Sequence, residues 1–135
     1  RRLGSKYPLN DLRIANLPSR FKGTILLLLV EFEFSQACFF GLGAIGKPDE
    51  NVADEAIDDL EKFLKTSGVV DKYLADQLLL PLVFTDDSSI YSTPVITKHL
   101  LTNAAVIHHF SPGIIQVEGE IGKPGTVRVN HEFKD

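Results

Sequence analysis

Residues 89–130 read SIYSTPVITKHLLTNAAVIHHFSPGIIQVEGEIGKPGTVRVN and carry the pattern from which the fold class follows. A short strand is predicted at Ser89–Thr93, and a helix follows from about Lys98 to Phe110, where apolar residues recur at helical spacing. Two runs rich in β-branched residues, 114–118 and 126–130, predict two more strands around a turn that contains Gly and Pro. Strand, helix, strand and strand in this order predict a sheet covered by helices.

A second helix is predicted upstream, in DKYLADQLLLPLVF at residues 71–84. Asp71 can cap its start, and leucines four residues apart form one apolar stripe. Pro81 lacks the N–H group that would bond the carbonyl of Gln77, so we expect a kink or an early stop of the helix there.

The first half of the chain predicts a strand pair and one long helix. Residues 24–33 and Gln36–Leu42 are apolar or alternating runs with almost no spacer, which indicates a hairpin. Residues 48–68 place apolar residues at helical spacing opposite an acidic face, with Gly68 at the expected left-handed stop. Residues 1–23 are rich in Pro, Gly, Asn and Ser and are expected to be irregular. The order β-β-α-α-β-α-β-β fits an α+β protein better than a strictly alternating parallel fold.

Composition and charge restrict the classes of function. The chain has 135 residues and a net charge of −4 with acids and bases mixed, so no basic surface for sequence-independent nucleic-acid binding is predicted. The longest apolar run, residues 25–30, is far shorter than the roughly 20 residues of a membrane span, so we expect no membrane partner. The single cysteine, Cys38, cannot form an internal disulfide and lies in an apolar run, which favours a buried reduced thiol and a cytoplasmic setting.

Gly41, Gly43 and Gly46 form a G-x-G-x-x-G pattern directly after a predicted strand. A dinucleotide site requires the last glycine to open a helix whose N-terminus meets the pyrophosphate. Lys47 and Pro48 stand between Gly46 and the expected helix start, so a glycine-rich connection is the favoured interpretation. A dinucleotide-binding module stays as an alternative, and it requires the turn to open directly into the helix.

Tyr73, Asp76 and Gln77 are spaced i, i+3 and i+4 and therefore share one face of the second predicted helix. Periodicity alone favours a polar strip that faces solvent. The functional alternative is a nucleotide-holding set, because an aromatic ring, a carboxylate and an amide near a helix start can together hold a nucleobase and a ribose.

His99 is predicted to lie in the first turn of a helix with Thr97 as its N-cap. Backbone N–H groups at such an end can receive phosphate oxygens, and the positive potential there disfavours a charged imidazole. An uncharged imidazole beside a phosphate cradle is suited to nucleophilic attack on a phosphoryl group. The alternative is an ordinary polar residue at a helix end, since spacing identifies no general-base partner.

His108, His109 and His131 show no metal-ligand spacing, so no metal site is predicted in this chain. His108 and His109 are successive, and their side chains therefore point in different directions around a helix. All three are interpreted as surface residues.

Two linked motifs shift the balance between these alternatives. YLADQLLLP at residues 73–81 is followed by TKHLLTN at residues 97–103 and then by Phe110. In this order and spacing the motifs resemble the C-terminal part of the RNA 3'-terminal phosphate cyclase family. The resemblance extends more loosely from about Thr24 to the end of the chain, and two linked motifs are more specific than either alone.

The resemblance implies an ATP-dependent reaction of the ligase class on RNA 3'-phosphate ends. A histidine is adenylylated and passes AMP to the RNA 3'-phosphate, and the neighbouring 2'-hydroxyl then expels AMP and leaves a 2',3'-cyclic phosphate. Matched residue by residue, His99 falls at the nucleophile, and Tyr73, Asp76 and Gln77 fall at positions that contact the adenylate. The expected partners are therefore ATP and RNA 3'-phosphate ends.

The resemblance also implies a fold and a division of the chain. The family's large domain is built from β-α-β-α-β-β units, in which helices pack on one face of a sheet, like the C-terminal domain of translation initiation factor three. A smaller α/β domain is inserted into it. On this map residues 1–68 are the later part of the insert, and residues 69–135 complete the catalytic domain.

The family's N-terminal glycine-rich segment has no counterpart in this sequence. That segment supplies an acidic metal-associated residue and phosphate-binding groups, so the ligands of a divalent metal, Mg or Mn, are expected outside this chain. We therefore expect a C-terminal fragment that needs the missing N-terminal part of the same protein and is inactive or very weak alone.

The main alternative is a non-catalytic, cyclase-like protein that acts in ribosome biogenesis. That branch resembles the enzyme in fold but departs from it at the histidine. The presence of His99 together with Tyr73, Asp76 and Gln77 favours the enzyme.

Overall fold

The computed structural model describes residues 2–4, 6–20 and 22–131 of the chain. Its elements are β1 (Ile25–Glu31), β2 (Gln36–Leu42), α1 (Asp49–Phe63), α2 (Leu74–Gln77), α3 (Leu79–Val83), β3 (Ser89–Thr93), α4 (Lys98–Phe110), β4 (Ile115–Gly119) and β5 (Gly125–Val129). The chain divides into two compact units. One comprises the residues up to Leu28 with Phe39–Asp59, and the other comprises Leu29–Cys38 with the residues from Leu60 onward. The assignment of residues 1–68 to an insert and 69–135 to a catalytic domain stays a prediction.

The second unit contains a three-stranded antiparallel sheet in the order β3-β5-β4. Its central strand places Val127 opposite Tyr91 of β3 and opposite Val117 of β4. Val127 is fully buried, whereas the neighbouring Arg128 forms an ion pair with Glu118 of β4 at 3.2 Å. Successive residues of a strand point to opposite faces, so one face of the sheet is apolar and the other is polar.

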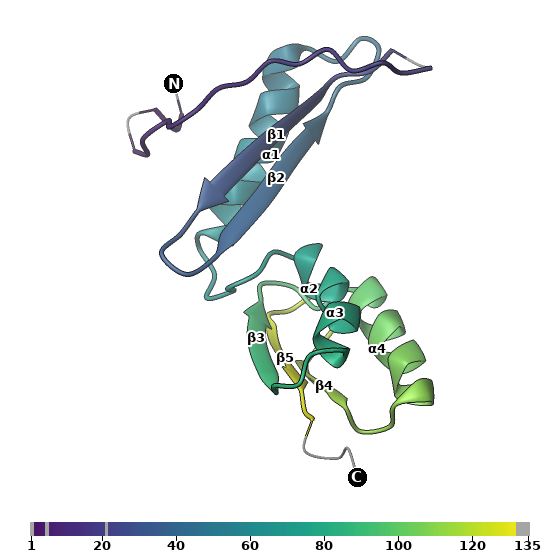
Figure 1. The fold of residues 1–135 in the computed structure, drawn as a ribbon. Helices are drawn as coiled ribbons and strands as arrows, with labels where there is room; N and C mark the ends of the chain where they lie inside the picture. The colour runs from purple at the N-terminus through teal and green to yellow at the C-terminus, as the bar shows by residue number, and fades with distance from the viewer. Residues whose placement is uncertain (1, 5, 21, 132–135) are drawn as a thin grey trace. The chain divides into compact units, whose positions relative to one another are not determined.

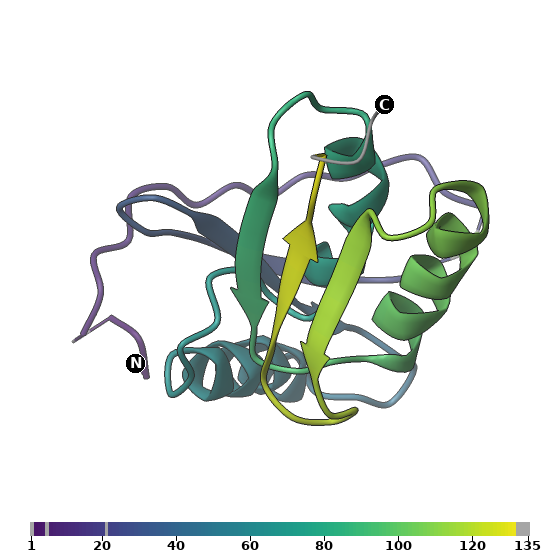
Figure 2. The same cartoon turned by 90° about the horizontal axis from the view of Figure 1, so that it is seen from below.

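Helices α2, α3 and α4 lie on one face of this sheet (Figure 1, Figure 2). Helices and strands share one core, which comprises Val70, Ala75, Leu79, Val83, Tyr91, Ile96, Leu100, Ile114, Ile115, Val127 and Val129. The mixture of helices with antiparallel sheets confirms the predicted α+β class. The finer assignment to a β-α-β-α-β-β unit with part of an insert stays a prediction.

The second predicted helix is divided into α2 and α3 at Leu78. Pro81 lies in the first turn of α3, where backbone N–H groups have no carbonyl partner within the helix. Proline, which lacks this N–H group, therefore costs α3 no internal hydrogen bond at this position. The same missing donor leaves the carbonyl of Gln77, the last residue of α2, without its regular helical partner. The expected stop is therefore present, but it comes at Leu78 rather than at Pro81.

The β1–β2 hairpin lies against helix α1 (Figure 1). Gly41 of β2 meets the backbone of the helix, because a Cβ atom at this position would stand 1.9 Å from the carbonyl oxygen of Val52. A Cβ atom at Gly43 would stand 3.1 Å from the carbonyl oxygen of Thr24, which accepts the Gly43 N–H group at 2.7 Å. Both glycines therefore allow two stretches of backbone to approach each other.

The glycine-rich turn does not open directly into α1. Gly46 has a φ of +80°, and two residues separate it from the first residue of the helix. One of them, Lys47, donates through Nζ to the carbonyl oxygen of Leu42 at 2.7 Å and pairs with Glu55 at 2.6 Å. The turn lacks the helix start at the third glycine that a dinucleotide site requires, so this alternative is not supported.

Two further local predictions are wrong. Cys38 is exposed rather than buried, because β2 alternates and its neighbours Ala37 and Phe39 occupy the buried face. Gly68 does not adopt a left-handed conformation. Instead, Pro94 lies so close that a Cβ atom on Gly68 would stand 2.6 Å from its Cδ atom. A close approach of two segments, and not a helix stop, therefore favours glycine at this position.

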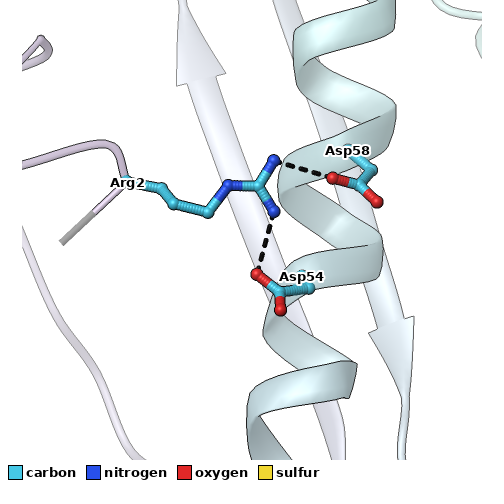
Figure 3. Close-up of polar contacts among 3 residues, drawn as sticks. All are labelled: Arg2, Asp54 and Asp58. Carbon is cyan, nitrogen blue, oxygen red and sulfur yellow. Dashed lines mark hydrogen bonds and ion pairs between the residues drawn. The ribbon is translucent and has the colours of Figure 1, made fainter.

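The N-terminal segment is largely irregular, as predicted, and residues 8–20 form neither helix nor strand. Arg2 contacts α1 through two ion pairs, with Asp54 at 2.9 Å and with Asp58 at 2.7 Å (Figure 3). The two aspartates are four residues apart and so lie on the same side of the helix. Exposed ion pairs of this kind contribute roughly 0–1 kcal/mol to stability.

Candidate functional site

His99 lies in the first turn of α4, where the sequence predicts it. The Thr97 hydroxyl oxygen accepts a hydrogen bond from the backbone N–H of Leu100 at 3.1 Å, so the predicted N-cap is confirmed. Leu100 is fully buried and anchors this turn in the core, whereas the side chain of His99 is exposed. In the described part of the chain, no hydrogen bond or ion pair involves the His99 ring, so no general-base partner is found.

Tyr73, Asp76 and Gln77 lie in and just before α2, with Tyr73 at the N-cap position. The carboxylate of Asp71 is buried and accepts hydrogen bonds from the backbone N–H groups of Tyr73 at 2.8 Å and of Leu74 at 3.0 Å. The predicted capping role of Asp71 is therefore confirmed, and it holds the backbone that carries the Tyr73 ring. Tyr73 is 45% exposed and Gln77 is also exposed, so a ligand can reach both side chains.

Asn103 joins α2 to α4, two helices that pack against each other. Its Nδ2 atom donates a hydrogen bond to Oδ2 of Asp76 at 3.3 Å. Asn103 follows His99 by four residues, so the two side chains lie along the same side of α4. The structure therefore brings Asp76 to the side of the helix that carries His99. Sequence reasoning missed Asn103, although its i+4 spacing from His99 within TKHLLTN was a usable signal.

Tyr91 of β3 supports α2 from the core. Its buried hydroxyl group donates a hydrogen bond to the carbonyl oxygen of Ala75 at 2.6 Å. Burial raises the pKa of Tyr91 above its ordinary value, and the negative charge of Asp76 raises this pKa further. No local pattern points to Tyr91, because its partner belongs to another element.

The comparison of the chain with protein-family models gives one assignment. Residues 7–117 match the model described as RNA 3'-terminal phosphate cyclase. The chain belongs to the RNA 3'-terminal phosphate cyclase family. The match includes both YLADQLLLP and TKHLLTN, the two motifs on which the resemblance rests.

Relatives of this cyclase-family chain carry the name RNA 3'-terminal phosphate cyclase. The protein from Thermococcus kodakarensis is 47% identical over 88 residues, which cover 65% of this chain and 25% of the relative. The protein from a Nostoc species is 40% identical over 110 residues, which cover 78% of this chain and 32% of the relative. The protein from Pyrococcus furiosus is 32% identical over 134 residues, which cover 93% of this chain and 39% of the relative. The cyclase-family chain thus spans between a quarter and two fifths of the length of these relatives.

The other histidines of the cyclase-family chain have separate surroundings. His108 accepts a hydrogen bond at Nδ1 from the backbone N–H of Gly113 at 3.3 Å, and His109 is exposed. The prediction that His131 is a surface residue is wrong, because the end of β5 returns to α3. There its Nε2 atom lies 2.9 Å from the Leu82 carbonyl oxygen, and its Nδ1 atom is buried without a hydrogen-bond partner among the described residues.

Residues 2–4, 6–20 and 22–131 contain neither a cluster of metal ligands nor a helix that could cross a membrane. No three His, Cys, Asp or Glu side chains in this part of the chain stand together as a possible metal site. None of its helices is both long enough and apolar enough to pass through a membrane.

Replacing Thr97 with alanine should lower the free energy of unfolding by about 1 kcal/mol, because the Leu100 N–H group loses its acceptor. Denaturant unfolding at equilibrium measures the change. Thr97→Ser keeps the hydroxyl oxygen and should lose less than about half as much. Equal losses in the two variants would contradict the capping role.

Replacing Tyr91 with phenylalanine should lower the free energy of unfolding by about 1–2 kcal/mol, because the Ala75 carbonyl group loses its buried donor. The pKa of Tyr91 is raised in the folded state, so the stability that the phenol contributes is present below its unfolded pKa of about 10. That contribution is lost as the pH rises toward the folded pKa. The stability gap between the parent protein and Tyr91→Phe should therefore shrink above about pH 10, as denaturant unfolding at pH 8 and pH 11 would measure. A gap that stays constant would contradict this.

Proposed function

We propose that the protein carrying this chain converts RNA 3'-phosphate ends to 2',3'-cyclic phosphates and consumes ATP through a histidine-AMP intermediate. The proposal is carried by the exposed His99 at the capped start of α4, beside the helix that bears Asp76, in a chain of this family. Relatives with the name RNA 3'-terminal phosphate cyclase support the reaction type. The activity is proposed for the full gene product, since this chain spans 25% to 39% of those relatives.

The proposed reaction has three steps. An imidazole nitrogen of His99 attacks the α-phosphorus of ATP, a P–N bond forms, and the bond to the bridging oxygen breaks to release pyrophosphate. An oxygen of the RNA 3'-phosphate then attacks the same phosphorus atom and displaces the imidazole. Finally, the RNA 2'-hydroxyl loses its proton, attacks the activated 3'-phosphorus and expels AMP, which leaves the 2',3'-cyclic phosphate.

The start of α4 suits the phosphate side of this substrate. The first backbone N–H groups of a helix have no carbonyl partner within it, and they can donate to phosphate oxygens. His99 belongs to this first turn, so its ring and these donors stand at the same end of the helix. A phosphate bound there would lie within reach of the nucleophile.

The polar residues of α2 suit the nucleoside side. The half-exposed ring of Tyr73 offers a stacking surface for adenine, and the Asp76 carboxylate can accept a hydrogen bond from a ribose hydroxyl. Gln77 is exposed and offers an amide that can both donate and accept. We assign these three residues to adenylate binding because they share α2, the helix that Asn103 links to α4.

The divalent metal expected for such a reaction, Mg or Mn, does not fit the residues that the structure describes. No suitable group of ligands stands together in the part of the chain that the structure describes. We therefore propose that residues outside these 135 hold the metal, and we expect the 135-residue chain alone to be inactive or very weak.

Incubation of the full gene product with a divalent metal, ATP labelled at the α-phosphate and an RNA that ends in a 3'-phosphate tests the proposal. Covalent AMP on the protein and a phosphatase-resistant RNA end are expected. An RNA with a 3'-hydroxyl end is the control, and it should leave the protein labelled without any cyclic product. Cyclic product without protein-bound AMP would refute the intermediate, and the absence of both would favour the non-catalytic, cyclase-like alternative.

A further inference from the structure

The Asp76 carboxylate is held from the side of α4. Oδ2 of Asp76 accepts the hydrogen bond from Nδ2 of Asn103 at 3.3 Å, across the contact between α2 and α4. An amide N–H that donates to a carboxylate restricts the rotation of both side chains. Because one carboxylate oxygen is engaged, Oδ1 is the oxygen with the greater capacity to accept a hydrogen bond from a ligand.

The backbone of α2 is held by other groups. The hydroxyl of Tyr91 binds the Ala75 carbonyl oxygen, and the carboxylate of Asp71 binds the N–H groups at the start of the helix. Asn103 itself is exposed and does not belong to the apolar core. Removal of the Asn103 amide should therefore change the direction of the Asp76 side chain without moving the helix that carries it.

We propose that Asn103 is a positioning residue that directs the Asp76 carboxylate toward the side of α4 that presents His99. The inference rests on the proposed function, in which Asp76 binds the ribose of the nucleotide that His99 attacks. A hydrogen bond to a ribose hydroxyl depends on the direction of the accepting oxygen. Asn103 thus acts on the nucleotide through Asp76, and it links nucleotide binding on α2 to the helix of the nucleophile.

The first test is Asn103→Ala in the full gene product. The ATP concentration that gives half-maximal covalent labelling should rise about tenfold, which corresponds to one hydrogen bond to a charged group. The labelling rate at saturating ATP and the denaturant midpoint of unfolding should change little. His109→Ala is the matched control, because His109 is exposed on another side of the same helix and should leave all three quantities unchanged. A half-saturating ATP concentration unchanged by Asn103→Ala would overturn the inference.

Two further variants separate a positioning role from a general structural one. In an Asp76→Ala background, Asn103→Ala should raise the half-saturating ATP concentration by less than about twofold. The reason is that the effect of Asn103 requires the Asp76 carboxylate, which this background lacks. Asn103→Asp places a second carboxylate against Asp76, so its deficit relative to the parent protein should be large at pH 8 and should shrink toward pH 5, where the pair shares a proton. The inference would be overturned if Asn103→Ala caused its full loss in the Asp76→Ala background as well. It would also be overturned if the deficit of Asn103→Asp did not depend on pH.

Calorimetric titration with AMP distinguishes failure of this inference from failure of the proposed function. The proposed reaction is wrong and the inference stands if three results occur together: the parent protein binds AMP, Asn103→Ala weakens that binding about tenfold, and neither protein is labelled. If the parent protein is labelled and Asn103→Ala binds AMP equally well, the inference alone is wrong. If the parent protein neither binds AMP nor is labelled, both are wrong.

Discussion

Replacing His99 with alanine is expected to abolish covalent AMP labelling of the full gene product, with a loss of at least about 1,000-fold in rate. The methyl group of alanine has no lone pair, so the P–N bond cannot form. AMP binding should persist, because the residues proposed to hold the nucleoside lie on α2. Gel detection of protein-bound label and calorimetric titration with AMP measure the two effects separately.

The fold of the His99→Ala variant should be intact, because the side chain is exposed and makes no hydrogen bond in the described part of the chain. The free energy of unfolding should change by less than about 0.5 kcal/mol. His109→Ala removes the same type of side chain from the same helix and should retain full labelling. Undiminished labelling of His99→Ala would assign the AMP to another residue.

Replacing Leu100 with alanine should lower the free energy of unfolding by about 2–5 kcal/mol, the largest effect on stability expected here. Leu100 is 0% exposed and belongs to the core between α4 and the sheet, so truncation leaves a cavity. It also anchors the turn that carries His99, and labelling of the full gene product should fall as that turn loosens. Denaturant unfolding measures the stability, and the labelling assay measures the second effect.

The adjacent Leu101 offers a matched control, since the same leucine-to-alanine change removes the same atoms. Leu101 is 39% exposed, so Leu101→Ala should cost less than about 1 kcal/mol and should leave labelling intact. Equal losses of stability in the two variants would show that Leu100 does not anchor the start of α4.

Much of the fold could be predicted because it depends on local patterns. The predicted bounds of β2, β3 and α4 agree with the structure, since alternation, helical spacing and the Thr97 cap are all read within a few residues. The features that were missed depend on distant segments. The close approach of Pro94 explains why glycine stands at position 68, and the return of the chain past α3 explains why His131 is not a surface residue. The face that β2 turns toward α1 explains the exposure of Cys38.

The candidate site divides in the same way. The caps at Asp71 and Thr97 were predictable, because a cap bonds N–H groups within three residues of itself. The hydrogen bond from Asn103 to Asp76 spans 27 residues, and that from Tyr91 to Ala75 spans 16. The spacing of residues within one helix or strand cannot predict a hydrogen bond between two different elements.

The sequence by itself determined the α+β class, the start of α4 with His99 in its first turn, and the family to which the chain belongs. These follow from short-range patterns and from two motifs whose order and spacing are specific. Only the tertiary structure decided that α2 packs against α4, which brings Asp76 to Asn103 on the side of α4 that carries His99. It also decided that the Tyr91 hydroxyl group donates a hydrogen bond to the Ala75 carbonyl oxygen of α2. The reason is physical: such contacts form when apolar faces of separate elements are buried together, and burial is a property of the whole core rather than of any one segment.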